Sequence, residues 1–410
     1  MTSTDTKAAL SPTSALADLR VLELGHFVAA PFCTRLLGDL GADVIKVEPL
    51  KGDPVREWGA QVGGRSLWWS VHGRNKRSVS IDVRAPGACE LVLGLAAKSD
   101  VIVENFRPGH MGKLGLGDAA LRAQNPDLVI AHVSGFGQDG PYGKKPAFGV
   151  IGEAIGGLRY LSDHAPGTCD LPPVRAGISV GDSVAGLYAA FGIMVALWQR
   201  SRAGGTTVDV ALSEAVLSLM EGMLPEYSRL GIVRQPTGSR IATAAPSSAY
   251  PTADGARVII AANSDILFAK LCDRMGRPEL AADPRFHGNR ARVENVEALD
   301  AEIDRWSLTF DAATLLKALE EANIPSCKIY TAVDCANDIQ FRHRNMVREA
   351  NDTNFGTILH PGIVPHIVES PGSVRWTGPD VGAHTDAVLT ELLGMKAERL
   401  AELRERRVIA

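Results

Sequence analysis

The chain has 410 residues, which is enough for one large domain or two ordinary ones. Hydrophobic residues make up 45% of it and charged residues 22%, as in an ordinary globular protein. The formal net charge of -4 gives no reason to expect nucleic acid or an anionic membrane as a partner.

The sequence also argues against a membrane, secreted or metal-dependent protein. No apolar run is long enough to span a bilayer without a charge or a cluster of glycines. Residues 1–18 are polar and Ser/Thr-rich, which predicts a flexible tail and not a signal peptide. The histidines form no HxxxH pair, so we expect no metal site. The cysteines form no CxxC pair and predict reduced thiols in a cytoplasmic protein; they are Cys33, Cys89, Cys169, Cys272, Cys327 and Cys335.

The first structured segment predicts a βαβ unit. Residues 19–24 form an apolar strand, residues 29–40 have the composition of a helix, and residues 42–48 form a second strand. Such a unit implies parallel strands, and ligands of parallel sheets bind beyond the carboxyl ends of the strands. We therefore expect a ligand near the His-Phe-Val turn at residues 26–28. The GxGxxG fingerprint is absent here, which disfavours ordinary dinucleotide binding.

Strands and helices continue to alternate after this unit. Further strands are expected at 78–83, 100–106 and 128–133, with a helix at 88–99 and a loop at 111–116. This alternation is typical of an α/β domain with a parallel sheet.

A short basic run, Arg74-Asn75-Lys76-Arg77, precedes the strand at 78–83. Such a run is usually a solvated loop. Next to a ligand edge it can hold phosphates instead, because charge-assisted hydrogen bonds suit phosphate oxygens. The sequence leaves both interpretations open.

The stretch from Arg175 to Arg200 holds a long apolar segment with a single acid near its start, Asp182. Its length and its Ala, Leu and Met content favour a buried helix over a strand. Asp182 can be the N-cap of this helix, where its carboxylate would accept free backbone N–H groups and meet the positive end of the helix dipole. It can also be a covalent nucleophile. Spacing alone favours the cap, and the two roles are compatible.

The character of the chain changes after about residue 225. Before that point, a strand is expected at 207–212 and a helix at 213–223, with Ser213 as its cap. Residues 225–335 predict a second, smaller domain of mixed strands and helices.

The predicted large domain is therefore discontinuous. Its N-terminal part covers residues 19–224, and residues 336–410 return to it and end in helices at 386–395 and 397–404.

Several separated segments together resemble the class III CoA-transferase family. That family includes formyl-CoA transferase, carnitine CoA-transferase and succinate–hydroxymethylglutarate CoA-transferase, with α-methylacyl-CoA racemase as a relative. The resemblance covers nearly the whole chain, and its motifs are specific for the superfamily but not for the substrate. They read VLELGHFVAAPFCTRLLGDLGADVIKVEP, GRNKRSVSIDVR, DVIVENFRPGHMGKLGLG, VSGFGQDGPY, ISVGDSVAGLYAAFGIMVAL and GAHTDAVLTELLG.

The resemblance implies a fold and a reaction. The fold would be α/β, with a Rossmann-like large domain built from both chain ends, a smaller α+β domain, and two chains interlocked as a homodimer. The family nucleophile matches Asp182, which overturns the preference for a mere cap. The implied activity moves CoA from an acyl-CoA donor, such as succinyl-CoA, to a small organic acid through a covalent aspartyl-CoA intermediate. CoA thioesters and small carboxylic acids would be substrates, with no tightly bound cofactor.

The resemblance also carries over the CoA contacts. Arg84 and Lys113 would meet the CoA phosphates, and Ile81 and Phe106 would surround the adenine. The alternative is that Ile81 and Phe106 belong to the plain core and that the two cations are only solvated. The full set of expected CoA-binding residues is His26, Val28, Ala29, Ile81, Arg84, Asn105, Phe106, Arg107 and Lys113. Arg240 is a candidate partner for a substrate carboxylate, although a solvated arginine is commoner in such a loop.

The sequence departs from the family at two positions. Val28 replaces a glutamine of formyl-CoA transferase, and Gly149 stands where many relatives have an acid, so a formyl or oxalate substrate is disfavoured. Racemases of the family have a His-Asp pair where this chain has Phe148-Gly149, and their chemistry needs two bases at the α-carbon. A racemase or other isomerase, and a non-catalytic CoA-binding protein, remain the alternatives.

Overall fold

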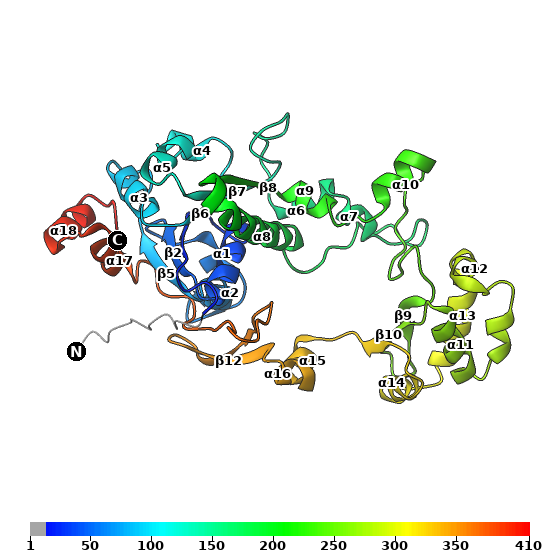
Figure 1. Ribbon diagram of the computed structural model, residues 1–410. Helices are drawn as coiled ribbons and strands as arrows, with labels where there is room; N and C mark the ends of the chain where they lie inside the picture. Colours follow the sequence, from blue (N-terminus) through cyan, green and yellow to red (C-terminus); the bar gives the residue numbers. More distant parts are fainter. Residues whose placement is uncertain (1–13) are drawn as a thin grey trace. The chain divides into compact units, whose positions relative to one another are not determined.

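The computed structural model describes residues 14–410 and divides them into two compact units, coloured by sequence in Figure 1. The first unit contains residues up to 158, then 176–224 and 339–410, so it draws on both ends of the chain. The second contains 159–175 and 225–338. The sequence did not predict that 159–175 would join the second unit. The first thirteen residues of the predicted tail lie outside the described part; residues 14–18 form a turn in which Leu16 N–H donates to Leu40 O at 3.1 Å.

A six-stranded sheet forms the centre of the described first unit. The strand order is β5-β2-β1-β6-β7-β8, and every neighbouring pair is parallel. This confirms the predicted α/β class with a parallel sheet. The strands are β1 (Arg20–Glu23), β2 (Asp43–Glu48), β5 (Lys76–Ser80), β6 (Val101–Glu104), β7 (Val129–Ser134) and β8 (Thr207–Ala211).

Helices cover both faces of this sheet because successive strand residues point to opposite sides. One face packs against α1 (Ala29–Asp39), α8 (Val180–Ala203) and α9 (Leu212–Leu217). The other packs against α3 (Ala88–Ala96), α5 (Asp118–Gln124), α17 (Thr385–Leu393) and α18 (Ala397–Glu405). The C-terminal segment thus completes a core begun by the N-terminal strands.

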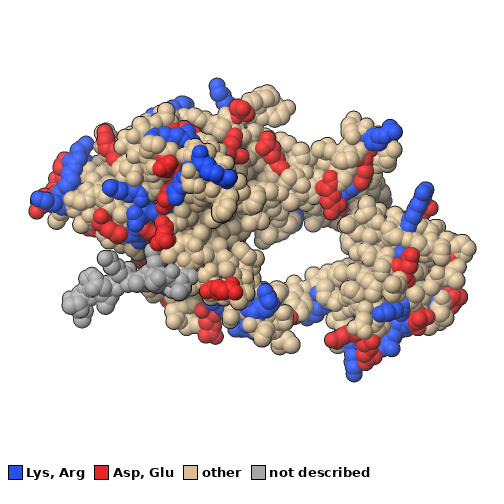
Figure 2. Space-filling model, in the orientation of Figure 1, with Lys and Arg blue, Asp and Glu red and all other residues tan. Residues whose placement is uncertain are grey.

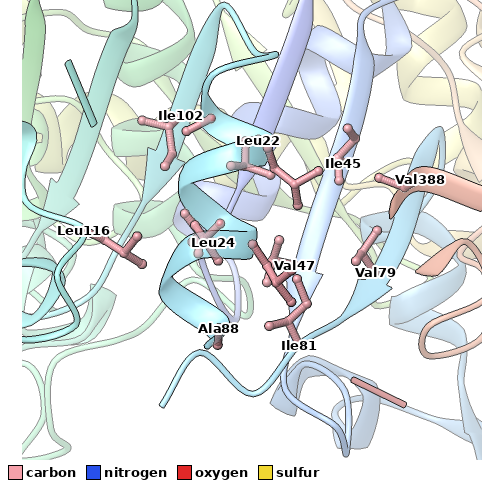
Figure 3. Packing of buried hydrophobic residues seen from close by; sticks show 14 of the residues in the cluster. Leu22, Leu24, Ile45, Val47, Val79, Ile81, Ala88, Ile102, Leu116 and Val388 are labelled. Carbon is pink, nitrogen blue, oxygen red and sulfur yellow. The ribbon is translucent and has the colours of Figure 1, made fainter. Parts of the chain in front are cut away.

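The second of these faces has a core of branched aliphatic side chains. In Figure 3, Leu22, Ile45 and Ile102 come from three neighbouring strands, with Val388 of α17 beside them. All four are fully buried. Burial of this kind stabilises a fold by roughly 1.5–3 kcal/mol per large aliphatic side chain. The core holds the sheet in place and thereby fixes where its loops emerge.

Two local predictions were wrong. The helix expected at 213–223 with Ser213 as cap is α9, which starts after Ala211 without a side-chain cap and ends at Leu217; a separate helix, α10 (Met223–Leu230), follows. The loop expected at 111–116 begins inside a short helix, α4 (His110–Lys113). Single backbone hydrogen bonds set these boundaries, with Leu219 N–H donating to Val216 O after α9 and Leu114 N–H donating to His110 O in α4, and composition alone does not reveal them.

The basic run is neither a solvated loop nor a phosphate site. Arg74 is buried and donates to both carboxylate oxygens of Asp39, at 2.9 and 2.6 Å. Lys76 is buried against Glu23 at 2.8 Å, and Arg77 pairs with Asp43 at 2.6 Å. The run leads into β5, and its cations form ion pairs with acidic residues of the same unit.

The described part of the first unit has two smaller additions. One is the segment between β2 and β5, with a 3-10 turn at Pro54–Glu57, a short hairpin of β3 (Gln61–Val62) and β4 (Arg65–Ser66), and α2 (Leu67–His72). The other is the antiparallel hairpin of β12 (Val347–Asp352) and β13 (Gly356–Pro361), which follows α16 (Ile339–His343).

The second unit has its own core and a three-stranded antiparallel sheet among its described residues. The sheet order is β11-β10-β9, from β9 (Ser247–Pro251), β10 (Arg257–Ala261) and β11 (Ser326–Lys328). Helices α11 (Asp265–Arg274), α13 (Val296–Ser307) and α14 (Ala312–Glu321) pack against it. Shorter helices lie at α7 (Leu158–Leu161), α12 (Gly288–Glu294) and α15 (Ala332–Asn337). Mixed strands and helices are what the sequence predicted here.

Helix α8 is a candidate for a membrane-spanning segment by length and composition, although it contains charged residues and glycines. Its 24 residues include a window of mean hydropathy 1.7, of which 39% is buried, and it alone among the described helices is long and apolar enough to cross a membrane. Length and composition are weak evidence, because the core helix of a soluble protein has the same properties. Ala185, Ala189 and Ile193 of α8 are fully buried in the core under the sheet.

The charged side chains are mixed in sign on the face drawn in Figure 2. Lysines and arginines alternate with acidic residues over both units on that face. This distribution agrees with the small net charge of the chain.

Candidate active site

A pocket opens where the order of the sheet reverses. The chain runs from β1 outward to β2 and β5, then returns to β6 on the other side of β1 and continues outward to β7. Between β1 and β6 the loops that leave the carboxyl ends turn in opposite directions, and ligands of open parallel sheets bind in the crevice between them. The volume here is about 900 Å³, including space open to solvent. Its lining is His26, Phe27, Ala29, Asn105, Phe106, Arg107, Pro108, Val133, Ser134, Gly135, Lys145, Ala147, Phe148, Asp182 and Leu212.

Asp182 reaches this pocket from the first turn of α8. The helix begins at Val180, so Asp182 is its third residue and not its N-cap. Ser179 holds the cap position without a side-chain hydrogen bond. The sequence-based prediction of a cap was therefore wrong by position. The expected proximity to the positive end of the helix dipole was right, and it favours an ionised carboxylate.

Two glycines allow the backbone to close around Asp182. A Cβ at Gly149 would lie 2.1 Å from Oδ2 of Asp182, and a Cβ at Gly181 would lie 2.8 Å from the carbonyl oxygen of Gly149. Larger residues at either position would displace the carboxylate or the start of α8. The departure from the family noted at Gly149 thus has a structural consequence: the Asp182 carboxylate occupies the space that a side chain would need.

Sequence reasoning missed Glu153, which supports the same turn. Glu153 lies one helical turn after Gly149 in α6 (Gly149–Ile155) and is buried. Its Oε1 accepts a hydrogen bond from Gly181 N–H at 3.3 Å. It thereby caps the start of α8 from another helix. The sequence signal for Glu153 was its position as the acidic residue of a helix of small and apolar residues, four residues after Gly149.

Asn105 joins the loop after β1 to the loop after β6. These two loops border the pocket, and we call them its two lips. Its Oδ1 accepts from His26 N–H and its Nδ2 donates to His26 O, both at 2.8 Å. The rings of His26 and Phe106 meet edge to face with centroids 5.3 Å apart. The loop after β1 and the loop after β6 are therefore held as one surface.

A buried cluster of charges lies behind the loop after β1. The Nζ of Lys46 is 2.7 Å from both Glu23 Oε1 and Asp53 Oδ2, and it donates to Gly25 O at 2.8 Å. Asp53 Oδ1 in turn accepts from Phe27 N–H at 3.1 Å. Burial would raise the pKa of both carboxyls, but Lys46 outweighs it and holds each pKa below its usual range. We name Glu23, Lys46 and Asp53 the lysine cluster.

A second cluster lies behind the loop after β6. His132 Nδ1 is 2.5 Å from Glu104 Oε1, and His132 Nε2 is 3.0 Å from Asp118 Oδ1. Glu104 Oε2 accepts from Phe106 N–H at 2.6 Å. Burial opposes the charged ring, but Asp118 and Glu104 outweigh it and raise the pKa of His132 to about 9. His132 in turn lowers the pKa of Asp118 to about 2. We name Glu104, His132 and Asp118 the histidine cluster.

A smaller hollow of about 550 Å³ adjoins the pocket, because His26 and Phe106 line both. Ile81 and the exposed Arg84 line this hollow, as does His110. Ile81 also belongs to the core, so it serves packing and lining together. Arg84 thus lines one of two adjoining spaces, and Asp182 lines the other.

Eight of the predicted site residues line one or both of these spaces, and three line neither. Val28 is buried at the start of α1 and lies outside both linings. Lys113 is exposed at the end of α4 and also lies outside both. Arg240 is in the second unit, where its Nε is 3.1 Å from Asp300 Oδ2.

The sequence placed Phe27 at the expected ligand edge and marked Phe148 as a departure from the racemases, but it did not single out Lys145, which also lines the pocket. Phe27 has a left-handed backbone, with φ of 62°, which turns the loop after β1 across the pocket. Lys145 lies over the ring of Tyr142 at 3.6 Å, and Phe148 is largely exposed beside Asp182. The loop that contains Lys145 lacks hydrophobic periodicity, so the sequence pattern gives no signal for that residue. Within residues 14–410, no group of three or more His, Cys, Asp or Glu side chains could hold a metal ion.

Comparison with curated and solved proteins gives consistent relatives. The chain is 48% identical over 401 residues to the succinyl-CoA–D-citramalate CoA-transferase of Chloroflexus aurantiacus, covering 97% of this chain and 99% of that one. It is 37% identical over 402 residues to the beta subunit of that organism's succinyl-CoA–L-malate CoA-transferase, covering 97% and 98%. A crystal structure of a CAIB/BAIF family protein from Brucella suis matches with a TM-score of 0.80 at 31% identity, covering 94% and 100%.

The family assignment rests on nearly the whole chain. The model of CoA-transferase family III matches residues 16–385, a range that includes both lips of the pocket and Asp182. Relatives with this extent of coverage share the fold and the general activity. The chain therefore belongs to CoA-transferase family III and is an enzyme that transfers CoA between acids.

Proposed function

We propose that this enzyme moves CoA from succinyl-CoA to a small dicarboxylate, with Asp182 as the covalent nucleophile. The observation that carries the proposal is the position of Asp182, which lines one pocket with His26, Asn105, Phe106 and Arg107. The named substrates of the Chloroflexus relatives, succinyl-CoA with citramalate or malate, favour a hydroxy-dicarboxylate of four or five carbons as acceptor.

The reaction begins when the Asp182 carboxylate attacks the thioester carbonyl of the donor. CoA thiolate leaves, and a mixed anhydride of succinate and Asp182 remains. The thiolate then attacks the Asp182 carbonyl, which releases succinate and leaves an aspartyl-CoA thioester. The acceptor carboxylate attacks this thioester, and the thiolate returns to the acceptor carbonyl. Asp182 is regenerated as a carboxylate, and no net proton or water is consumed.

The two adjoining spaces would bind the two ends of the acyl-CoA substrate. Arg84 at the outer end would meet CoA phosphates, and Ile81 and Phe106 would enclose the adenine. His26, Ala29, Asn105 and Arg107 would guide the pantetheine arm toward Asp182. Val28, Lys113 and Arg240 keep their proposed roles, Val28 and Lys113 toward CoA and Arg240 toward the acceptor. An interlocked homodimer and a cytoplasmic location complete the proposal.

Chemical trapping at Asp182 tests the proposal. The protein is incubated with succinyl-CoA, quenched with hydroxylamine or borohydride, digested, and the peptide that contains Asp182 is weighed. We expect a mass change on that peptide in wild type and none in Asp182→Ala. Asp386→Asn is a matched control, because Asp386 is a first-turn acid of α17 that lines neither space. This variant should be trapped like wild type.

Failure of trapping would direct attention to the alternatives. An unmodified Asp182 with several donors, combined with deuterium exchange at the α-carbon of an acyl-CoA, would indicate an isomerase. CoA binding without any acyl exchange or proton exchange would indicate a binding protein. Phe148 and Gly149 at the pocket, in place of two bases, favour the transferase.

A further inference from the structure

Ser134 is the last residue of β7, at the same sheet edge as Asp182. Its side chain is buried, and its hydroxyl oxygen has no hydrogen-bond partner within the described residues. Ser134 lines the pocket that Asp182 lines. A buried hydroxyl without a partner lowers the stability of a protein, so its presence calls for an explanation.

The other polar groups at this strand end are occupied. The ring of His132 contacts Glu104 and Asp118, at 2.5 and 3.0 Å. The carbonyl oxygen of Gly135 accepts from both N–H and Oγ of Ser213, at 3.3 and 3.2 Å. Gly135 itself must remain a glycine, because a Cβ there would lie 2.3 Å from Cβ of Ala147. The backbone around Ser134 is therefore fixed, while its hydroxyl is left to a ligand.

We propose that the Ser134 hydroxyl donates a hydrogen bond to the acyl oxygen of the species that forms at Asp182. Each attack in the proposed reaction converts a carbonyl into a tetrahedral carbon with a negatively charged oxygen. A fixed donor beside that oxygen stabilises the tetrahedral state more than the ground state. The hydroxyl keeps its proton throughout, and the electron pair returns from the oxygen to re-form the carbonyl when the leaving group departs.

This inference rests on the proposed transferase function and adds a catalytic hydrogen-bond donor to it. Removal of one such donor lowers kcat by about 100-fold or more in a related kind of site. In the proposed function, other residues of the two spaces bind the CoA thioester, so its dissociation constant should be unchanged. Stability should be unchanged or higher, because Ser134→Ala removes a buried group that has no partner in the protein.

The test measures kcat, the dissociation constant of CoA and Tm for wild type, Ser134→Ala and Ser134→Thr. We expect Ser134→Ala to lower kcat about 100-fold at unchanged CoA affinity and equal or higher Tm. Ser134→Thr, which retains the hydroxyl, should recover most of the lost kcat. Ser80→Ala is the matched control, because Ser80 is likewise buried with an unpartnered hydroxyl and lines neither space. It should leave kcat unchanged.

The outcomes separate this inference from the proposed function. If Ser134→Ala keeps kcat within threefold of wild type while Asp182→Ala abolishes exchange, the inference is overturned and the transferase function stands. A Ser134→Ala variant that loses activity together with Tm or CoA affinity would indicate a structural role and also overturn it. If wild type exchanges no CoA between acids, the proposed function itself fails.

Discussion

The two lips of the pocket are each supported by a cluster of charged residues, and the two clusters differ in their cation. The lysine cluster holds the loop after β1 through Asp53, which accepts from Phe27 N–H. The histidine cluster holds the loop after β6 through Glu104, which accepts from Phe106 N–H. Each places a cation between two carboxylates and ends on a backbone N–H group at the pocket, and in the lysine cluster Lys76 is a second cation, 2.8 Å from Glu23.

The difference between them is the cation. The pKa of Lys46 is raised by Asp53 and Glu23 against the effect of burial, so Lys46 stays charged at every physiological pH, whereas burial lowers the pKa of Lys76, which lies beside Glu23, to about 8. The pKa of His132 is raised to about 9, so the histidine cluster loses its charge in mildly alkaline solution. One lip is thus fixed by a permanent charge, and the other responds to pH.

The strongest test of the comparison removes the permanent cation. Lys46→Met leaves the buried Asp53 without its lysine, while Glu23 keeps its contact with Lys76. Breaking a buried ion pair from one side costs about 3–5 kcal/mol. We expect the free energy of unfolding to fall by about that amount in denaturant titrations, with weaker CoA binding because the loop at Phe27 loses its support.

An exposed lysine supplies the control for this variant. Lys51 is exposed in the loop after β2, and Lys51→Met should change stability by no more than about 0.5 kcal/mol. Equal losses in the two variants would mean that the lysine cluster has no special importance.

The next test uses pH to discharge the histidine cluster. The folded pKa of His132 is about 9, above its ordinary value of 6.5, so folding favours the protonated ring. Its stabilisation is complete below pH 6.5 and is lost as the pH rises through 9. At 1.36 kcal/mol per pKa unit it is worth up to about 3 kcal/mol.

His132→Gln isolates this contribution. The free energy of unfolding of wild type should exceed that of the variant most below pH 6.5, and the difference should shrink as the pH rises to 9.5. The variant's own stability should lack this decline. A difference that is constant from pH 6 to 9.5 would show that the ring is neutral in the fold.

These clusters also mark the limit of what the sequence predicts. Each strand and helix of the first βαβ unit was predicted within about two residues, because apolar composition and the glycine after the helix are local signals. The cations of β2 and β5 have no such signal. Lys76 pairs with Glu23, a residue far from it in the chain, so the sequence suggested solvent or phosphate where the fold supplies a buried acid.

The same distinction between local signals and contacts of distant segments applies to the candidate site. His26, Asn105 and Asp182, which the motifs singled out, line one pocket, and they come from segments whose strands and helices can be predicted locally. The contact of Glu153 with Gly181 and the consequence of Gly149 depend on the packing of α6 against α8, and the burial of the Ser134 hydroxyl depends on the fold around the end of β7. Single-residue patterns do not contain that information.

The last and smallest expected effect concerns the residue that joins the two lips. Asn105→Ala removes both hydrogen bonds to His26, which contribute together about 1–3 kcal/mol. Asn125→Ala is the matched control, because Asn125 also makes two backbone hydrogen bonds, to Ser99 O and from Asp127 N–H, but lines neither space.

Both asparagine variants should lose similar stability in denaturant titrations, whereas CoA affinity should separate them. We expect the dissociation constant of CoA to rise about tenfold in Asn105→Ala, equivalent to about 1.4 kcal/mol, and to stay unchanged in Asn125→Ala. The physical reason is that the lysine and histidine clusters each fix one loop, whereas the two hydrogen bonds of Asn105 to His26 join the loops to each other. If both variants bind CoA like wild type, each cluster positions its lip independently, and the bridge contributes to folding alone.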